Sequence, residues 1–312
     1  MIQQALVISK PNYESTTYTE ETTTQQIKNT SYSFPHDWNI ILSPDNELCG
    51  NDSNKMLTFI AFVIIAPHQF DQRQKIRETW ANKMISEKFR VFFMVGLSKD
   101  ENVNNQLKEE SNTNKDILQE DFYDSYFNMT KKVMASFKWI STNCKNSYFT
   151  LKIDSDIVVN TYKLIEYLDG LVSNNQHKNK LIGHVFHGAI PQRFAEGTWY
   201  VSIEDFPDPV YHDFCSGVAY ILSNELIKAF FEYSLNFYKR KFSEYIEDVY
   251  IGWIAKQLNT ELINIGDFYF PNDHYSGMGI QQKERELKFR KDQTYFVTEK
   301  LDLPIIWNVF RK

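Results

Sequence analysis

The chain has 312 residues, enough for one large domain or two small ones with a sizeable hydrophobic core. Aromatic residues make up 15% of it and charged residues 24%, a globular composition that excludes disordered and collagen-like proteins. The net charge of −6 argues against a broad basic face that grips nucleic acid, so no nucleic-acid partner is expected.

The N-terminal segment differs in composition from the rest of the chain. Residues 11–33 contain seven Thr and three Ser and almost no aliphatic residues. Such a segment buries too little apolar surface to offset its ordering entropy, so residues 1–55 are predicted to be a low-complexity stem or tail. A folded domain is expected over residues 56–312. The apolar run at 57–67 is too short for a membrane helix, and neither an anchor nor a signal peptide is visible.

Beyond this segment, short apolar runs alternate with amphipathic stretches. The predicted strands, each a continuous apolar run, span residues 57–66, 89–96 and 148–153. The predicted helices span residues 72–84, with Asp71 as a candidate N-cap, 125–140, 224–238 and 248–258. Loops and short strands are expected between residues 188 and 217. The alternation indicates an α/β fold with a largely parallel sheet.

A pair of carboxylates follows the third predicted strand. Asp154 and Asp156 stand two residues apart between two apolar runs, where neither can be buried unpaired without a large cost in free energy. A hard divalent cation shared with a diphosphate is a natural partner, because Mg²⁺ and Mn²⁺ take oxygen ligands. The alternative is a polar turn between strands, since such triplets are common.

Two arginines lie on one face of the first predicted helix. Arg73 and Arg77 are four residues apart, just after a strand-to-helix turn where free backbone N–H groups favour an anion. Two guanidinium groups at this place would suit a diphosphate. The alternative is a solvated basic face that Asp71 and Glu78 offset.

Two acids and a histidine complete the candidate residues. Glu247 and Asp248 begin a predicted helix, where one of them is a candidate general base for an attacking hydroxyl. The alternative is that acids simply favour a helix N-terminus. His274 lies in a predicted loop, and a lone histidine in a loop is usually only solvated.

These segments, taken in order, resemble glycosyltransferase family 31, the β-1,3-galactosyltransferase and β-1,3-N-acetylglucosaminyltransferase family. No single segment is specific, but the ordered set is. The matching segments comprise residues 64–66, 73–80, 92–96, 116–132, 152–160, 199–207, 211–223 and 247–252. The resemblance implies the GT-A type of α/β fold, a Rossmann-like sandwich with a mostly parallel central sheet, over residues 56–312.

The resemblance also implies roles for the candidate residues. Asp156 would be the main metal ligand, Asp154 would bind the metal indirectly or the donor ribose, and His274 would be a further metal ligand. The metal would be Mn²⁺ or Mg²⁺. Ser155 departs from the family, whose metal motif usually has an acid at this position.

The implied reaction is an inverting transfer of galactose or N-acetylglucosamine from a UDP-sugar. Arg73 and Arg77 would face the UDP, and Asp248 would be the general base. The acceptor would be a hydroxyl of a glycan on a glycoprotein or glycolipid, with a β-1,3 linkage formed. Two alternatives remain: a UDP- or glycan-binding pseudoenzyme, which Ser155 motivates, and a phosphohydrolase that uses Asp154 and Asp156.

The resemblance places the protein in the Golgi lumen, although the membrane anchor expected of the family is not seen. An oxidising lumen would allow two of the three cysteines to pair. The sequence does not say which two of Cys49, Cys144 and Cys215 would do so.

Overall fold

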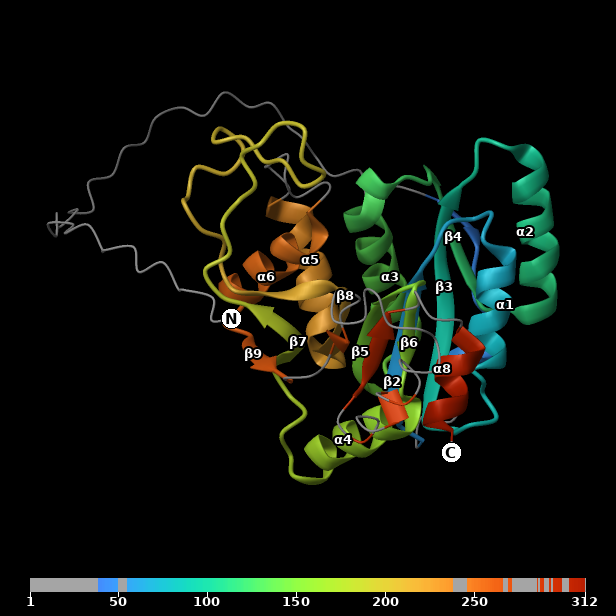
Figure 1. Ribbon diagram of the computed structural model, residues 1–312. Coiled ribbons are helices and arrows are strands. Elements are labelled where there is room, and N and C mark those ends of the chain that lie inside the picture. The colour runs from blue at the N-terminus through green and yellow to red at the C-terminus, as the bar shows by residue number, and fades with distance from the viewer. Residues whose placement is uncertain are drawn as a thin grey trace, which may run out of the picture. The chain divides into compact units, whose positions relative to one another are not determined.

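The computed structural model describes residues 39–49, 55–237 and 246–265, together with 269–270, 285, 287–288, 292, 294–298 and 303–311. These residues form an α/β fold in which helices cover both faces of one large sheet (Figure 1). The expected fold class, a GT-A type Rossmann-like sandwich with a mostly parallel central sheet, is confirmed. Among the described residues, no helix has the length and apolarity needed to cross a membrane.

The large sheet has eight strands in the order β1-β4-β3-β2-β5-β8-β7-β9. The strands are Ile40–Leu42 (β1), Leu57–Ile64 (β2), Phe89–Leu97 (β3), Ile117–Tyr123 (β4), Ser147–Asp154 (β5), Lys180–Phe186 (β7), Phe214–Ser223 (β8) and Glu261–Asn264 (β9). Strands β2, β3, β4 and β5 run parallel, whereas β8 runs antiparallel to both β5 and β7. As a result, β5 ends and β8 begins at the same edge of the sheet.

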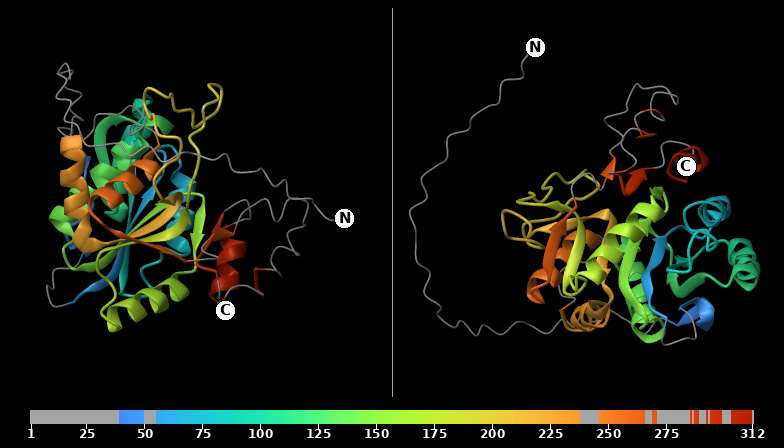
Figure 2. Two further views of the ribbon diagram at one scale, coloured as in Figure 1. Left: turned by 90° about the vertical axis from the view of Figure 1, so that its left-hand side faces the viewer. Right: turned by 90° about the horizontal axis from the view of Figure 1, so that it is seen from below.

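Two hydrophobic cores lie on opposite faces of this sheet. Successive side chains of a strand point to opposite faces, and in β2 residues 59, 61 and 63 enter one core while residues 60, 62 and 64 enter the other. Because both faces are covered, every residue of β2 is buried, which explains the continuous apolar run in the sequence. The two helical layers are visible from the side and from below in Figure 2.

Helices from distant parts of the chain form each layer. The helices are Phe70–Glu78 (α1), Glu101–Asn114 (α2), Met129–Asn143 (α3), Thr161–Ser173 (α4), Ile227–Phe237 (α5), Glu247–Gln257 (α6) and Leu303–Phe310 (α8). Helices α1, α2, α4 and α8 contribute to the first core, and α3, α5 and α6 to the second. Short 3-10 helices lie at Asn46–Cys49 (η1), Tyr126–Asn128 (η2) and Asn224–Leu226 (η3).

A small second sheet holds the segment that follows Asp154. Strand β6 (Ile157–Val159) pairs antiparallel with β11 (Phe296–Thr298), which pairs in turn with β10 (Tyr269–Phe270). All three residues of β6 are buried. The turn with Asp156 is therefore fixed at both ends, by the large sheet before it and by the C-terminal part of the chain after it.

The ends of some helices differ from the sequence prediction, which used only the spacing of apolar residues. The helix predicted at 72–84 is α1, which ends at Glu78 because the Thr79 hydroxyl binds the Lys75 carbonyl oxygen at 2.6 Å and Trp80 turns into the core. Asp71 lies in the first turn of α1 and is not its N-cap. Helices α2 and α4 were not predicted, and only Leu107 and Ser111 of α2 are buried.

The folded unit begins earlier than the predicted boundary at residue 56. Strand β1 pairs with β4, Ile40 opposite Glu120, and Cys49 forms a disulfide with Cys144 at the end of α3. The pairing that the sequence left open is thus Cys49–Cys144, and Cys215 is a free, buried thiol. Burial raises the pKa of the Cys215 thiol to about 12, so it is not a reactive thiolate.

The disulfide is expected to stabilise the fold strongly, because it closes a loop with a sequence separation of 95 residues. Replacement of both cysteines, Cys49→Ser with Cys144→Ser, should lower the free energy of unfolding by about 2–5 kcal/mol in urea denaturation. Wild type and a Cys215→Ala control should both lose stability when a reductant is added, whereas the double variant should not respond. Equal midpoints for wild type with and without reductant would contradict the prediction.

Candidate active site

A pocket of about 450 Å³ lies where β5 ends, β8 begins and α6 begins. Its lining includes Asp154 from the end of β5, Gly217 from β8, and Glu247 and Asp248 from the first turn of α6. In α/β sheets with parallel strands, ligands bind beyond the carboxyl ends of the strands. The sheet topology therefore brings two of the predicted site residues, Asp154 and Asp248, to one pocket.

Lys152 joins the elements that surround this pocket. Its Nζ lies 2.6 Å from Asp154 Oδ1, donates to the Gly217 carbonyl oxygen and lies 3.9 Å from Glu247 Oε2. Burial by itself would lower the pKa of Lys152, but the negative charges of Asp154 and Glu247 outweigh burial and raise it. Lys152 is thus a buried cation, and sequence reasoning did not assign it a role.

Asp248 is held by backbone donors at the N-terminus of α6. Its Oδ2 accepts from the Gly217 N–H at 3.1 Å, and its Oδ1 accepts from the Val249 N–H at 2.9 Å. A Cβ on Gly217 would lie 3.1 Å from Asp248 Oδ2, so a larger residue at 217 would push the Asp248 carboxylate away by a few tenths of an ångström. Burial raises the pKa of Asp248 although the Val249 N–H and Lys152 oppose the shift. A carboxylate with a raised pKa is a stronger base at neutral pH.

Glu247, the neighbouring acid, points to other partners. Its side chain is 3% exposed, and its Oε1 accepts from the Tyr220 hydroxyl at 2.5 Å. Burial raises the pKa of Glu247 to about 7, against the attraction of Lys152. The sequence offered both acids as candidates for the base. The structure separates them, because Glu247 is bound to Tyr220 whereas Asp248 is bound by backbone N–H groups.

The two carboxylates that are predicted to bind a metal, Asp154 and Asp156, differ in their surroundings. Burial raises the pKa of Asp154, and the charge of Asp156 adds to the shift. Asp156 is exposed in the turn between β5 and β6 and is not part of the pocket lining. The Gln72 side-chain amide donates to the Ser155 carbonyl oxygen at 2.7 Å and so holds this turn against α1. Ser155, which stands where the family usually has an acid, thus holds the turn through its backbone carbonyl group.

The carboxylates fit a hard divalent cation by charge and chemistry. Asp154, Glu247 and Asp248 lie near the buried ammonium group of Lys152, and the charges of neighbouring carboxylates contribute to the raised pKa values of Asp154 and Glu247. Within the described residues, no three His, Cys, Asp or Glu side chains form a metal-binding group on their own. Mg²⁺ commonly takes only one or two protein carboxylates and completes its shell with phosphates and water. His274 lies outside the described residues.

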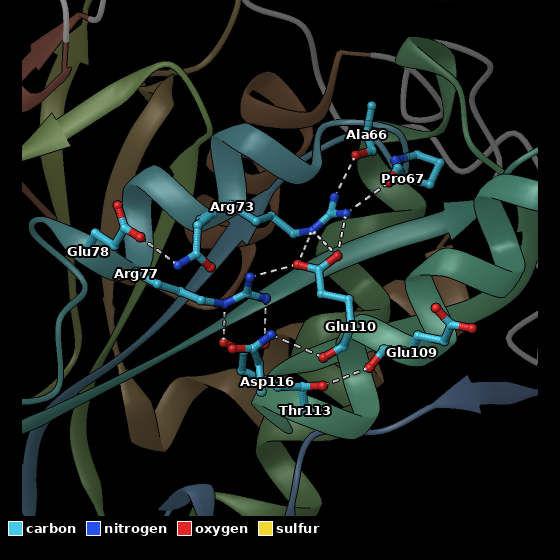
Figure 3. Close-up of polar contacts among 11 residues, drawn as sticks. Ala66, Pro67, Arg73, Arg77, Glu78, Glu109, Glu110, Thr113 and Asp116 are labelled. Carbon is cyan, nitrogen blue, oxygen red and sulfur yellow. Dashed lines mark hydrogen bonds and ion pairs between the residues drawn. The ribbon is translucent and has the colours of Figure 1, made fainter.

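Arg73 and Arg77 lie outside this pocket, in a network of ion pairs between α1, α2 and β4 (Figure 3). Arg73 Nε and an Nη contact Glu110 at 2.9 and 2.7 Å, and Arg77 contacts Glu110 at 2.7 Å and both Asp116 oxygens at 2.8 Å. Arg73 also donates to the carbonyl oxygens of Ala66 and Pro67, each at 3.0 Å.

Arg73 therefore holds the turn after β2, and both arginines are bound by carboxylates instead of forming the solvated face that was the alternative. Arg73 is fully buried and Arg77 is 14% exposed. Their contact with UDP stays a prediction. The partners Glu110 and Asp116 were missed, because no spacing rule links α1 to residues more than thirty positions away.

Aromatic side chains form a large part of the wall of the pocket. This wall contains Tyr126, Phe186, Trp199, Tyr211 and Phe214. The Trp199 indole N–H donates to the Tyr126 hydroxyl at 3.0 Å. Part of this wall comes from the irregular segment that follows β7, whose residues 189, 190, 192 and 199 line the pocket.

Comparison with known proteins agrees with this architecture. The family model described as Galactosyltransferase matches residues 71–265. Beta-1,3-galactosyltransferase 1 of Homo sapiens is 32% identical over 231 residues, covering 72% of this chain and 66% of that protein. Lactosylceramide 1,3-N-acetyl-beta-D-glucosaminyltransferase of Mus musculus is 31% identical over 230 residues, 70% of this chain and 58% of that protein. The chain thus spans between 58% and 66% of the length of these relatives.

Replacement of Glu110 should destabilise the fold, because Glu110→Gln leaves the fully buried Arg73 without its anionic partner. The expected loss is about 3 kcal/mol in urea denaturation. Glu109→Gln is the matched control, since Glu109 lies one residue away on the exposed side of α2 and should change the stability by less than about 0.5 kcal/mol. Equal stabilities of the two variants would contradict a structural role of the network.

The stability of the protein should fall between pH 4.5 and 7 through Glu247. Its pKa is about 7 in the folded state, above the ordinary value of 4.5 for a glutamate, so the folded state retains a proton that the unfolded state has lost. This contribution is complete below pH 4.5 and is lost as pH rises to about 7. Urea denaturation at pH 5 and 8 should show a fall of a few kcal/mol that is smaller in Glu247→Gln. The same fall in wild type and variant would contradict the assignment.

Proposed function

The chain belongs to the galactosyltransferase family, and on that premise we propose that it is a UDP-sugar-dependent β-1,3-glycosyltransferase. The reaction transfers galactose or N-acetylglucosamine from the UDP-sugar to a hydroxyl of a glycan, with inversion at the anomeric carbon. The observation that carries the proposal is the meeting of Asp154 and Asp248 in one pocket, from the end of β5 and the start of α6. A transfer reaction needs the group that binds the donor and the group that activates the acceptor to lie in the same pocket.

Asp248 acts as the general base in this proposal. Inversion in one displacement requires no enzyme nucleophile, only a base that takes the proton of the attacking hydroxyl. Asp248 lines the pocket, and burial raises its pKa, which favours acceptance of a proton near neutral pH. The N–H groups of Gly217 and Val249 fix the orientation of the carboxylate, so its direction is set before a substrate arrives.

Asp154 and Asp156 hold the divalent cation and the donor. Asp156 is exposed and offers its oxygens as ligands, and Asp154 faces the pocket, where it reaches the metal indirectly or the donor ribose. When bound, Mn²⁺ or Mg²⁺ neutralises the negative charge that develops on the departing diphosphate. Lys152 keeps Asp154 in place through its 2.6 Å contact. The phosphohydrolase alternative is not supported, because such two-metal sites need more acids than the turn provides.

The names of the relatives support both a galactose donor and an N-acetylglucosamine donor, and a glycolipid as one class of acceptor. The Cys49–Cys144 disulfide supports an oxidising compartment, in accord with the Golgi lumen. Residues 1–55 serve as the stem in this proposal, apart from residues 39–49, which pack on the catalytic domain. The pseudoenzyme alternative is not favoured, since base and metal carboxylates are both present.

The proposal is tested by a donor screen. Purified protein is incubated with Mn²⁺, β-linked sugar acceptors and each of UDP-galactose, UDP-N-acetylglucosamine, UDP-N-acetylgalactosamine and UDP-glucose, with EDTA as the control. Metal-dependent transfer from galactose or N-acetylglucosamine donors is expected. Binding of UDP and Mn²⁺ by calorimetry without transfer from any donor would favour the pseudoenzyme.

Two variants should separate the roles of the carboxylates. Asp248→Asn should lower kcat by about 10²–10⁴-fold and change the Kd for UDP less than about twofold, because only the base is altered. Asp156→Ala should weaken Mn²⁺-dependent UDP binding and abolish transfer. Glu166→Gln, which removes an exposed acid of α4, is the control and should behave as wild type. A collapse of UDP affinity in Asp248→Asn would make Asp248 a structural residue.

A further inference from the structure

The segment 187–213, between β7 and β8, forms part of the wall of the pocket that the carboxylates also line, although it has little regular structure. We infer that Arg193 is a positioning residue that holds this segment in the shape that binds the acceptor, an uncharged sugar whose ring lies on Trp199. The inference rests on the proposed function, because it assigns the acceptor side of that same site.

The guanidinium group of Arg193 binds four backbone carbonyl groups of the segment. One Nη donates to the oxygens of Val201 and Ser202 at 2.9 and 2.8 Å. The other Nη donates to the oxygens of Phe206 and Asp208 at 2.6 and 3.1 Å. A planar fork can bind several acceptors in fixed directions, which a lysine ammonium cannot reproduce. A single side chain thus links residues up to fifteen positions away in a stretch without helix or strand.

Gln192, the preceding residue, positions Trp199 directly. Its side-chain oxygen accepts from the backbone N–H of Trp199 at 3.0 Å, and its backbone carbonyl oxygen accepts from the backbone N–H of Val201 at 2.9 Å. A Cβ on Gly197 would lie 2.4 Å from the end of the Gln192 side chain, so a larger residue at 197 would displace the amide that binds Trp199. Gln192 therefore holds the backbone at Trp199 and at Val201.

The segment is also anchored to the helix that carries Asp248. Val201, Phe206 and Tyr211 form a small hydrophobic cluster with Phe214, Ile246 and Val249. Val201 is fully buried and Phe206 is 2% exposed. Because Arg193 binds the carbonyl groups of both Val201 and Phe206, it connects the exposed part of the wall to this cluster. The distance between the wall and the base is thereby set by packing.

Trp199 presents its ring to the pocket. The side chain is 57% exposed, yet its indole N–H is bound to the hydroxyl of Tyr126, which is 52% exposed. A large aromatic ring that stays open to solvent and is held by a hydrogen bond offers a preorganised apolar face. Such a face suits the C–H face of a pyranose ring.

The acids of the pocket decide the charge of the acceptor. Asp154, Glu247 and Asp248 line the same pocket as Trp199, and the ammonium of Lys152 is buried near these acids. A carboxylate on the acceptor would meet like charges at short range, which disfavours binding. The aromatic rings and the acids of the pocket together select an uncharged sugar.

The test compares Arg193→Met and Arg193→Lys with wild type. The probes are an uncharged aryl β-galactoside as acceptor and the matched aryl β-glucuronide. The acceptor KM should rise about ten- to hundredfold in Arg193→Met, while the Kd for UDP changes less than about twofold. Arg193→Lys should recover part of the loss, since one or two of the four bonds can form again. Wild type should use the β-glucuronide at least about tenfold less well than the galactoside.

Arg90→Met is the matched control, because Arg90 also donates to two backbone carbonyl groups, those of Glu87 and Phe89, but lies outside the pocket. It should leave the acceptor KM unchanged. If Arg193→Met does not fold, Tyr126→Phe serves instead, since it removes only the oxygen that holds the Trp199 indole; a rise in acceptor KM of about threefold or more is expected.

An unchanged acceptor KM in folded Arg193→Met, or in Tyr126→Phe if the former does not fold, would overturn the positioning role. A parallel loss of UDP affinity would do so as well, because the effect would then be general. Equal use of galactoside and glucuronide by wild type would overturn the uncharged acceptor. Absence of transfer in wild type with every donor would instead refute the proposed function, so the two failures are distinguishable.

Discussion

The buried ammonium group of Lys152 is the interaction on which the arrangement of the site depends. It lies where β5, β8 and α6 meet and contacts Asp154, the carbonyl group of Gly217 and Glu247. Carboxylates from separate elements repel one another in a small pocket, and a cation among them makes their approach possible. The strand directions bring the acids to the same edge of the sheet, and Lys152 allows them to remain there as neighbours.

The backbone at this edge is held by a second set of polar contacts. Asp124 accepts from the Gly96 N–H at 2.8 Å and pairs with Lys132 at 2.6 Å, and Lys132 donates to the Ile65 carbonyl oxygen at 3.0 Å. A Cβ on Gly96 would lie 2.7 Å from the Phe122 carbonyl oxygen, so glycine is required there. Together with Arg73 on the turn after β2, these contacts give the site a rigid frame, which preorganised binding requires.

Much of the fold could be predicted because burial on two faces leaves a local signal. The apolar runs that became β2, β3 and β5 were visible in the sequence, and so was the stripe of α3. Helix α2 was missed because it is polar almost all round and buries only Leu107 and Ser111. Strand β1 was missed because it is a short edge strand whose residues are mostly exposed, and its place depends on β4, nearly eighty residues later.

The sequence by itself determined which acids are candidates for the chemistry, because the acids after a buried strand and at a helix N-terminus form patterns that do not depend on the rest of the chain. Only the tertiary structure decided which of the candidate residues meet. It placed Asp154 and Asp248 in one pocket, bound Arg73 and Arg77 to Glu110 and Asp116, and paired Cys49 with Cys144. The physical reason is that these contacts join residues far apart in the chain, and strand order and packing alone decide which of them meet.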